Sequence, residues 1–160
     1  MAVKSDSNIN DGPEALGFYL SRAQIVFRSL LKNALVESGL DSFIKPGMGN
    51  LLFALYEHDG QTKTELASCL LLSKMTITRL VRQVESHGLV ITVRDERDGR
   101  ANRVNLTPLA KSLETKYRRV GRNLEARIAS QFTPRQLNQF RGYLKTLLMT
   151  LEDETSNSLC

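Results

Sequence analysis

The sequence contains no tryptophan and only two cysteines among its 160 residues. Two cysteines cannot build the disulfide framework of a small secreted domain, and one of them, Cys160, is the last residue, so we expect a reducing, cytoplasmic compartment. No apolar run approaches the roughly 20 uncharged residues that a membrane helix requires. Residues 1–12 lack the apolar region of a secretory signal, so we expect neither a secreted protein nor a membrane-bound one.

Basic residues are in modest excess over acidic ones. The chain has 22 Lys and Arg against 17 Asp and Glu, which gives a formal net charge of +5 and a pI near 9.4. A basic balance favours a polyanionic partner over an acidic substrate. Between Lys74 and Arg103 the basic residues exceed the acidic ones by three, so much of the net charge lies in this segment.

The first half of the chain shows a polar leader followed by helical periodicity. Residues 1–12 are small and polar, which predicts a disordered leader. From Leu16 onward apolar residues recur at steps of three and four, so the spacing predicts a long amphipathic helix within residues 13–40, ended by Gly39. A loop over residues 42–49 then precedes a short apolar helix, Leu51–Tyr56.

Two further helices are predicted after the breaker at Gly60. Thr62–Glu65 spells a capping box, in which a Thr hydroxyl and a Glu carboxylate each satisfy the other residue's backbone N–H, and a helix through Leu70 follows. Leu71-Leu72 forms a short turn, and Ser73 caps the next helix. The buried stripe of this helix contains Ile77, Leu80, Val81 and Val84. The pair is a helix-turn-helix.

The pattern then changes to strands and back to helices. Leu89–Val93 and Arg103–Leu106 read as two strands, and the charged segment Asp95–Arg100 between them carries an Asp-Gly turn, so we expect a β-hairpin with a charged tip, called a wing. Two Thr-Pro pairs, at 107–108 and 133–134, open two long helices that together reach residue 152. Residues 153–160 are expected to fray.

These elements predict a mainly α protein with a small β-hairpin. A winged helix-turn-helix over residues 46–107 is flanked by long dimerisation helices over 13–40 and 108–152. The apolar ladder from Leu137 to Leu151 is too long for a winged helix to cover, so a second copy of the chain is the expected partner. The alternative, a monomeric bundle on the first helix, stays open on the sequence.

The outward face of the second helix of the helix-turn-helix has side chains that can read base edges. Turning about 100° per residue from the buried Ile77 places Met75, Thr78, Arg79 and Arg82 opposite the core, with Thr76 and Gln83 at the margins. Arg can bind guanine with two hydrogen bonds, and Met or a Thr methyl can cover the thymine methyl. The same residues would also suit an ordinary solvated helix face.

The motifs in this region resemble those of the MarR family of bacterial and archaeal transcriptional regulators. Four stretches carry the resemblance, which covers residues 61–110 in motif and nearly everything after Pro13 in element order. They are Thr62–Leu70, Ser73–Val81, Asp98-Gly99-Arg100 and Leu106-Thr107. Met75 stands where the family usually has a small residue, and Ala110 stands where it often has Gly.

The resemblance implies a transcriptional repressor that binds a pseudo-palindromic operator in double-stranded DNA as a homodimer. It also implies that Asp98 holds Arg100 extended for the minor groove, while Lys74 contacts phosphate at the helix N-terminus. The full set of expected DNA-binding residues is Ser73, Lys74, Met75, Thr76, Thr78, Arg79, Arg82, Arg94, Arg97, Asp98 and Arg100. A small aromatic or phenolic effector is expected between the dimerisation helices and the winged helix, with Phe27, Arg28 and Tyr56 as candidate contacts.

Catalysis has no support in the sequence, and we expect neither an enzyme nor a cofactor or metal. His58 and His87 flank predicted helix ends, and arginines interleave the acidic residues of the wing. Cys69 has no basic neighbour in sequence, which favours a structural role over a redox role. The alternative to DNA binding is a protein-interaction module that assembles through its long helices.

Overall fold

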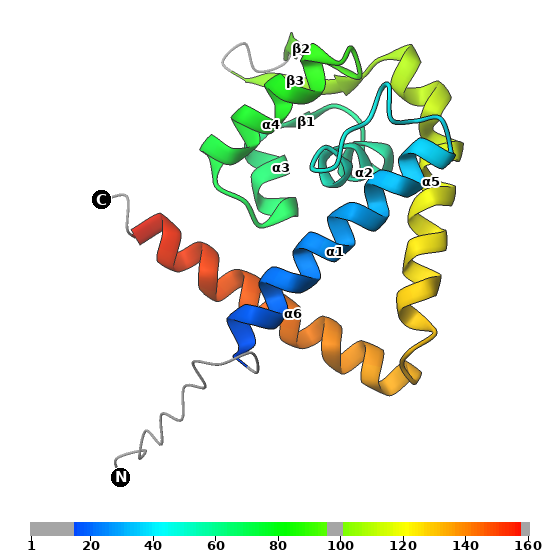
Figure 1. Ribbon diagram of the computed structural model, residues 1–160. Helices are drawn as coiled ribbons and strands as arrows, with labels where there is room; N and C mark the ends of the chain where they lie inside the picture. Colours follow the sequence, from blue (N-terminus) through cyan, green and yellow to red (C-terminus); the bar gives the residue numbers. More distant parts are fainter. Residues whose placement is uncertain (1–14, 96–100, 158–160) are drawn as a thin grey trace.

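The computed structural model describes residues 15–95 and 101–157, with side chains to Leu151, and is mainly helical with one small antiparallel sheet, which confirms the predicted fold class (Figure 1). The elements in chain order are α1 (Leu16–Glu37), α2 (Gly49–Glu57), β1 (Gln61–Thr62), α3 (Lys63–Leu70), α4 (Lys74–Ser86), β2 (Val90–Arg94), β3 (Asn102–Leu106), α5 (Pro108–Ala129) and α6 (Pro134–Asn157). None of the described helices has the length and apolar content needed to cross a membrane.

The helix-turn-helix forms where the sequence predicts it. At the start of α3, Glu65 N–H donates to Thr62 Oγ1 at 3.2 Å and Thr62 N–H donates to the Glu65 carboxylate at 2.7 Å, so the predicted capping box is confirmed. Leu71 adopts a left-handed conformation with φ +53° and ends α3. Ser73 then caps α4 by accepting a hydrogen bond from Thr76 N–H at 3.1 Å.

The core of the winged helix lies under α4. Ile77, Val81 and Val84 are buried on its inner face, as predicted, whereas Leu80 is only half-buried at the edge of that stripe. They pack with apolar residues from α2, α3 and the sheet, so α4 is fixed by one face while its other face is left open. The fully buried members of this core outside α4 include Leu51, Leu52, Leu55, Leu66, Leu89 and Val104.

The sheet has the order β1-β3-β2, with all pairs antiparallel. The predicted hairpin pairs Val90 with Leu106 at its base and Arg94 with Asn102 at its far end. The strand β1, which pairs Gln61 with Val104, was not predicted, because a two-residue strand is too short to show alternation in the sequence. It joins the start of α3 to the wing.

One helix end agrees with the prediction and one differs. The last helical residue of α1 is Glu37, and Gly39 ends the helix as predicted, because it adopts a left-handed conformation with φ +64° and its N–H donates to the Val36 carbonyl at 2.8 Å. α6 continues to Asn157, so the expected frayed tail over 153–160 is wrong for residues 153–157. No Gly or Pro follows Gly142, and acidic residues alone do not end a helix. The predicted leader, residues 1–12, lies outside the described residues.

Helices α1, α5 and α6 extend away from the winged helix (Figure 1). α5 packs against the C-terminal part of α1, where Leu35 and Val120 are buried. In α6 no described side chain, up to Leu151, is buried. A single chain therefore covers part of α5 and leaves α6 largely without packing partners.

Candidate nucleic-acid interface

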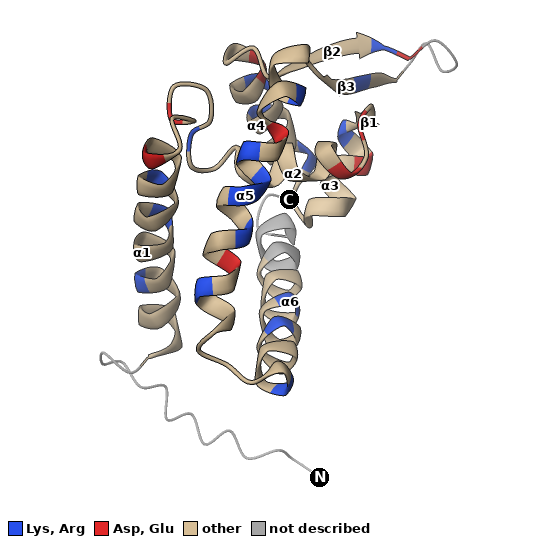
Figure 2. Cartoon of the chain, turned by 90° about the vertical axis from the view of Figure 1, so that its right-hand side faces the viewer, with Lys and Arg blue, Asp and Glu red and all other residues tan. Residues whose placement is uncertain are grey.

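The outer face of α4 brings together five of the predicted DNA-binding residues. Lys74, Met75, Thr78, Arg79 and Arg82 line one depression of about 650 Å³. Four of them are exposed, Met75 at 68% of its surface, while Thr78 is half-buried. Figure 2 shows the basic residues of α4 and of the strands β2 and β3 in blue. The face combines cationic groups with one apolar side chain, and α4 has no acidic residue in its first turn.

Hydroxyl groups at the start of α4 serve the helix itself. The Ser73 and Thr76 hydroxyls lie 2.8 Å apart, and both residues are half-buried at the cap. The Thr78 hydroxyl donates to the Lys74 carbonyl at 2.9 Å. The polar atoms of Ser73 and Thr76 therefore hold the first turn in place, and the groups that face outward are the long side chains of the helix.

The base of the wing is held by one buried carboxylate. Sequence reasoning placed Asp95 in a solvated loop tip, and this was wrong, because Asp95 is only 7% exposed. Its carboxylate accepts a hydrogen bond from Arg103 Nε at 2.5 Å, and its N–H donates to the Ala101 carbonyl at 2.9 Å. A carboxylate without this partner would be costly to bury, so the pair fixes where the hairpin closes.

Arg103 also connects the wing to the helix-turn-helix. Its Nη1 donates to the Gly60 carbonyl at 2.8 Å and lies 3.9 Å from the Glu65 carboxylate. Hydrogen bonds from Thr62, with a smaller contribution from Arg103, hold the pKa of Glu65 below its ordinary value. One guanidinium thus joins β3, the wing base and the turn before α3.

Asp59 is a second connecting residue that sequence reasoning missed. Its carboxylate accepts from Leu106 N–H at 2.7 Å and from Gly60 N–H at 2.9 Å, and it forms an ion pair with Lys111 at 2.8 Å. The Asp-Gly pair predicts a turn, but neither Leu106 nor Lys111 is close to it in sequence. Of the predicted wing residues, Arg94 is exposed at the end of β2, and Arg97, Asp98 and Arg100 lie outside the described residues.

The three predicted effector contacts lie on two different helices. Phe27 and Arg28 are exposed on α1, whereas Tyr56 is half-buried between α2 and α5. The Tyr56 hydroxyl donates to the Ala110 carbonyl at 2.8 Å, and its ring centre lies 6.0 Å from that of Tyr117. Tyr56 therefore stabilises the packing of α2 against α5, which apolar spacing alone did not distinguish from a pocket wall.

Tyr56 gives a pH-dependent prediction. Burial, aided by the nearby Glu114, raises its pKa from 10.0 to about 12. The unfolded chain therefore ionises this phenol first, and we expect the free energy of unfolding to fall as pH rises from 10 through 12. Tyr56→Phe keeps the ring, should cost about 1 kcal/mol at pH 7 for the lost hydrogen bond, and should reduce the loss above pH 10. Urea unfolding at pH 7, 10 and 11.5 measures both effects, and equal alkaline losses in both proteins would contradict the assignment.

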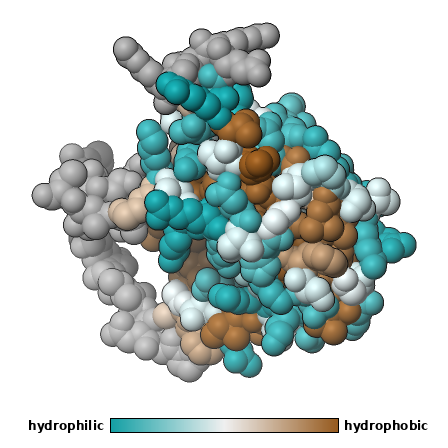
Figure 3. Space-filling view, turned by 90° about the horizontal axis from the view of Figure 1, so that it is seen from above, coloured by the Kyte–Doolittle hydropathy of each residue, from teal (hydrophilic) through white to brown (hydrophobic). Residues whose placement is uncertain are grey.

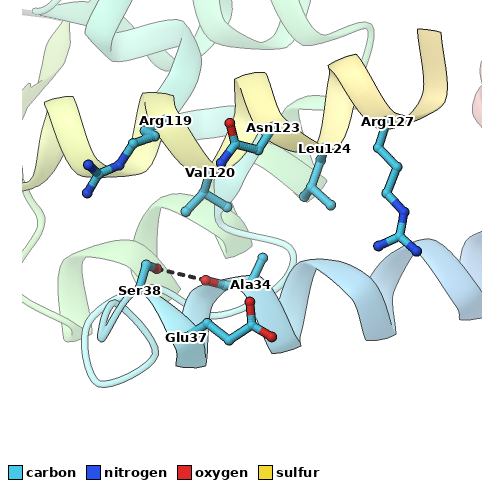
Figure 4. A pocket seen from close by; sticks show the side chains of 8 residues that line it. All are labelled: Ala34, Glu37, Ser38, Arg119, Val120, Asn123, Leu124 and Arg127. Atoms are coloured by element: carbon cyan, nitrogen blue, oxygen red, sulfur yellow. Dashed lines mark hydrogen bonds between the residues drawn. The ribbon is translucent and has the colours of Figure 1, made fainter. Parts of the chain in front are cut away.

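A cavity of about 380 Å³ lies between α1 and α5 (Figure 4). Val120 and Leu124 form its apolar part, and Arg119 and Arg127 of α5 stand on either side of them, opposite Glu37 of α1. The remaining lining residues are Ala34, Ser38 and Asn123. Phe27, Arg28 and Tyr56 are not among them. The lining thus combines a small apolar surface with several polar side chains, and its two guanidinium groups favour an acid.

The outer helices expose apolar side chains. The exposed set on α1 is Leu16, Phe18, Tyr19, Ile25, Val26, Phe27 and Val36, and that on α6 is Phe140, Tyr143, Leu148, Met149 and Leu151. At the sheet end of the molecule, by contrast, apolar patches are separated by hydrophilic surface (Figure 3). Exposed apolar side chains gathered on the outer helices are typical of an interaction surface.

Within the described ranges 15–95 and 101–157, no group of three or more His, Cys, Asp or Glu residues is arranged to hold a metal ion. His58 and His87 are the residues that follow the last turns of α2 and α4. Cys69 is a free, exposed thiol on α3. These residues add no chemistry to the α4 surface.

Residues 49–101 match the sequence model of the MarR family, and no curated protein matches the chain in sequence. A MarR transcriptional regulator from Methanosarcina mazei Go1 has a similar fold, with 24% sequence identity over 90% of this chain and 97% of that chain and a TM-score of 0.63. CouR from Rhodococcus jostii RHA1 bound to p-coumaroyl-CoA is 23% identical over 84% of this chain and 92% of that chain, with a TM-score of 0.68. The S. aureus MepR–DNA complex is 21% identical over 86% of this chain and 98% of that chain, with a TM-score of 0.70. Residues 49–101 are therefore similar in sequence to the MarR family, and the chain shares the winged-helix fold of these three structures.

Proposed function

We propose that this protein is a sequence-specific DNA-binding transcriptional regulator. The observation that carries the proposal is the outer face of α4, where Lys74, Arg79 and Arg82 surround Met75 on a helix anchored by its opposite face. A single helix fits the major groove, and these side chains can bind phosphates and base edges there. The wing, which includes Arg94 and the predicted contacts Arg97, Asp98 and Arg100, lies along the neighbouring backbone and minor groove. The MepR–DNA complex, a fold neighbour, supports this assignment.

The DNA-binding form is a homodimer. The support is the exposed apolar surface of α1 and α6, since burying such surface against a second copy is the simplest way to remove it from water. Two-fold symmetry would place two α4 helices on one face of the duplex, about 34 Å apart, and would require a pseudo-palindromic operator. Where the operator overlaps a promoter, a bound dimer would block access to it, and the proposed regulator would then act as a repressor.

An acidic aromatic effector releases the dimer from DNA in this proposal. Its site is the cavity between α1 and α5, because Arg119 and Arg127 can bind a carboxylate while Val120 and Leu124 contact a ring. A fold neighbour, CouR, was solved with p-coumaroyl-CoA bound. Phe27, Arg28 and Tyr56, the contacts expected from the sequence, do not line this cavity.

Selection of bound duplexes from a random DNA library tests the DNA-binding function. We expect a defined site with two inverted half-sites, and an affinity that falls steeply as salt increases, because phosphate neutralisation releases counterions. If no sequence is enriched and no duplex binds at low salt, the protein is instead an interaction module that assembles through its helices. A helix-mediated protein contact would change little with salt.

The effector site predicts a loss of ligand binding on changing one arginine. Arg127→Ala is expected to weaken binding of aromatic carboxylic acids at least fivefold, as measured by the shift in melting temperature across a panel of such acids. Arg122→Ala is the matched control, because Arg122 lies on the same helix and does not line the cavity. Equal effects of the two substitutions would argue against this cavity as the effector site.

A further inference from the structure

Met75 is the most exposed large apolar residue of the winged helix. It is the second residue of α4 and is 68% exposed, compared with 52% for Phe53 and 51% for Ile91. Met75 does not pack in the core, because α4 contacts the core through Ile77 and Val81 on its other face. Exposing an apolar side chain of this size to water is unfavourable, which favours contact with a binding partner.

The surroundings of Met75 point to a partner with both charge and apolar surface. Thr78, Arg79 and Arg82 follow it at i+3, i+4 and i+7, so the four side chains form one continuous row on the helix, in the depression that they share with Lys74. A protein partner with an apolar surface would have to pack against these cations. A DNA major groove offers phosphates to the cations and, at one base alone, a methyl group.

Hydroxyl groups near Met75 are already engaged. Ser73 and Thr76 bond to each other at the cap, and Thr78 donates to the Lys74 carbonyl. Ser73 and Thr76 are half-buried at the cap whereas Met75 is 68% exposed, so the first turn of α4 presents mainly a thioether side chain to whatever lies against it. Met is unbranched and polarizable, which suits a contact of irregular shape.

We propose that Met75 determines specificity by contacting the C5-methyl group of thymine in each operator half-site, an inference that rests on the proposed DNA-binding function. Thymine is the only base with an apolar group in the major groove. Burial of one methyl group should increase affinity about fourfold. Arg79 and Arg82, farther along the same face, contact neighbouring bases or phosphates.

Deoxyuridine tests this contact, because it differs from thymine only by the missing methyl group. Each thymine of a selected site is replaced singly by deoxyuridine, and the affinity of wild-type protein, Met75→Ala, Met75→Leu and Lys74→Ala is measured. At one thymine position in the half-site, replacement should lower the affinity of wild type about fourfold. The same replacement should leave the affinity of Met75→Ala unchanged. Met75→Leu should retain the preference. Lys74→Ala should bind all duplexes more weakly and still prefer thymine about fourfold.

The outcomes separate this proposal from the function on which it rests. The methyl contact is wrong if wild type binds a defined site and no deoxyuridine replacement weakens that binding. It is also wrong if each replacement lowers the affinity of Met75→Ala as much as that of wild type. In both cases the proposed DNA binding stands. If no duplex binds at all, both proposals fail together. Because Met75 is exposed, its substitution should leave the melting temperature of the protein unchanged, and this measurement excludes misfolding as the cause of a lost preference.

Discussion

The double substitution Arg79→Ala with Arg82→Ala is expected to weaken operator binding roughly a hundredfold without changing the melting temperature. Both side chains are exposed on the outer face of α4, on the side away from Ile77. A well-placed arginine at a base edge contributes about 1–3 kcal/mol, and two such losses multiply in the binding constant. Fluorescence anisotropy with a labelled operator at fixed salt measures the change.

A control must separate the position of these charges from their number. Arg122→Ala with Arg135→Ala removes the same charge from exposed sites on α5 and α6. Because charges beyond a Debye length of about 10 Å are largely screened at 0.1 M salt, this control should change affinity less than threefold. Equal losses in both double variants would mean that α4 does not lie in the groove and that binding depends on net charge.

Charged substitutions on α6 should have the second large effect. Leu144→Glu with Leu147→Glu is expected to convert the dimer to a monomer and to reduce operator affinity at least a hundredfold. The two leucines are half-buried, as is Leu137, on a helix whose other described side chains are exposed. Carboxylates buried in an apolar interface without partners are strongly unfavourable, so the second chain should not bind. Light scattering should then give 18.0 kDa, the mass of one chain.

Lys145→Glu serves as the matched control for α6. It changes the charge of the same helix by two, at an exposed position that helical spacing places off the face of Leu144 and Leu147. It should stay dimeric and bind the operator with less than a threefold change. A wild-type mass near 18.0 kDa at micromolar concentration, or a leucine variant that keeps its dimeric mass, would contradict the role given to α6.

Local signals explain how much of the fold the sequence predicts. The capping box at Thr62, the cap at Ser73 and the Thr-Pro start of α5 each depend on residues within four positions of one another. A hairpin is also local, so β2 and β3 were predicted within one residue of their observed ends. The end of α6 was not predicted, because an acidic segment was taken for fraying although it contains no helix breaker.

The contacts that complete the candidate site are not local. Arg103 reaches Gly60, 43 positions away, and the Tyr56 hydroxyl reaches Ala110, 54 positions away. Nothing in the spacing of either residue shows such a partner. The α4 surface could be derived because one helix supplies all of it, whereas the cavity beside Arg127 needs α1 and α5 placed together.

Thr107 is the single residue between strand β3 of the wing and helix α5. β3 ends at Leu106 and α5 begins at Pro108, and the Thr107 hydroxyl donates to the Gly88 carbonyl at 2.7 Å while it caps α5. Because this connection is one residue long and hydrogen-bonded at both ends, β3 and α5 are expected to move together as one rigid unit. In the proposed dimer, a small change in the angle between the two α5 helices would therefore be magnified into a change in the spacing of the two wings. The distance between half-sites that this protein accepts is then set as much by the dimer interface as by the residues that touch DNA.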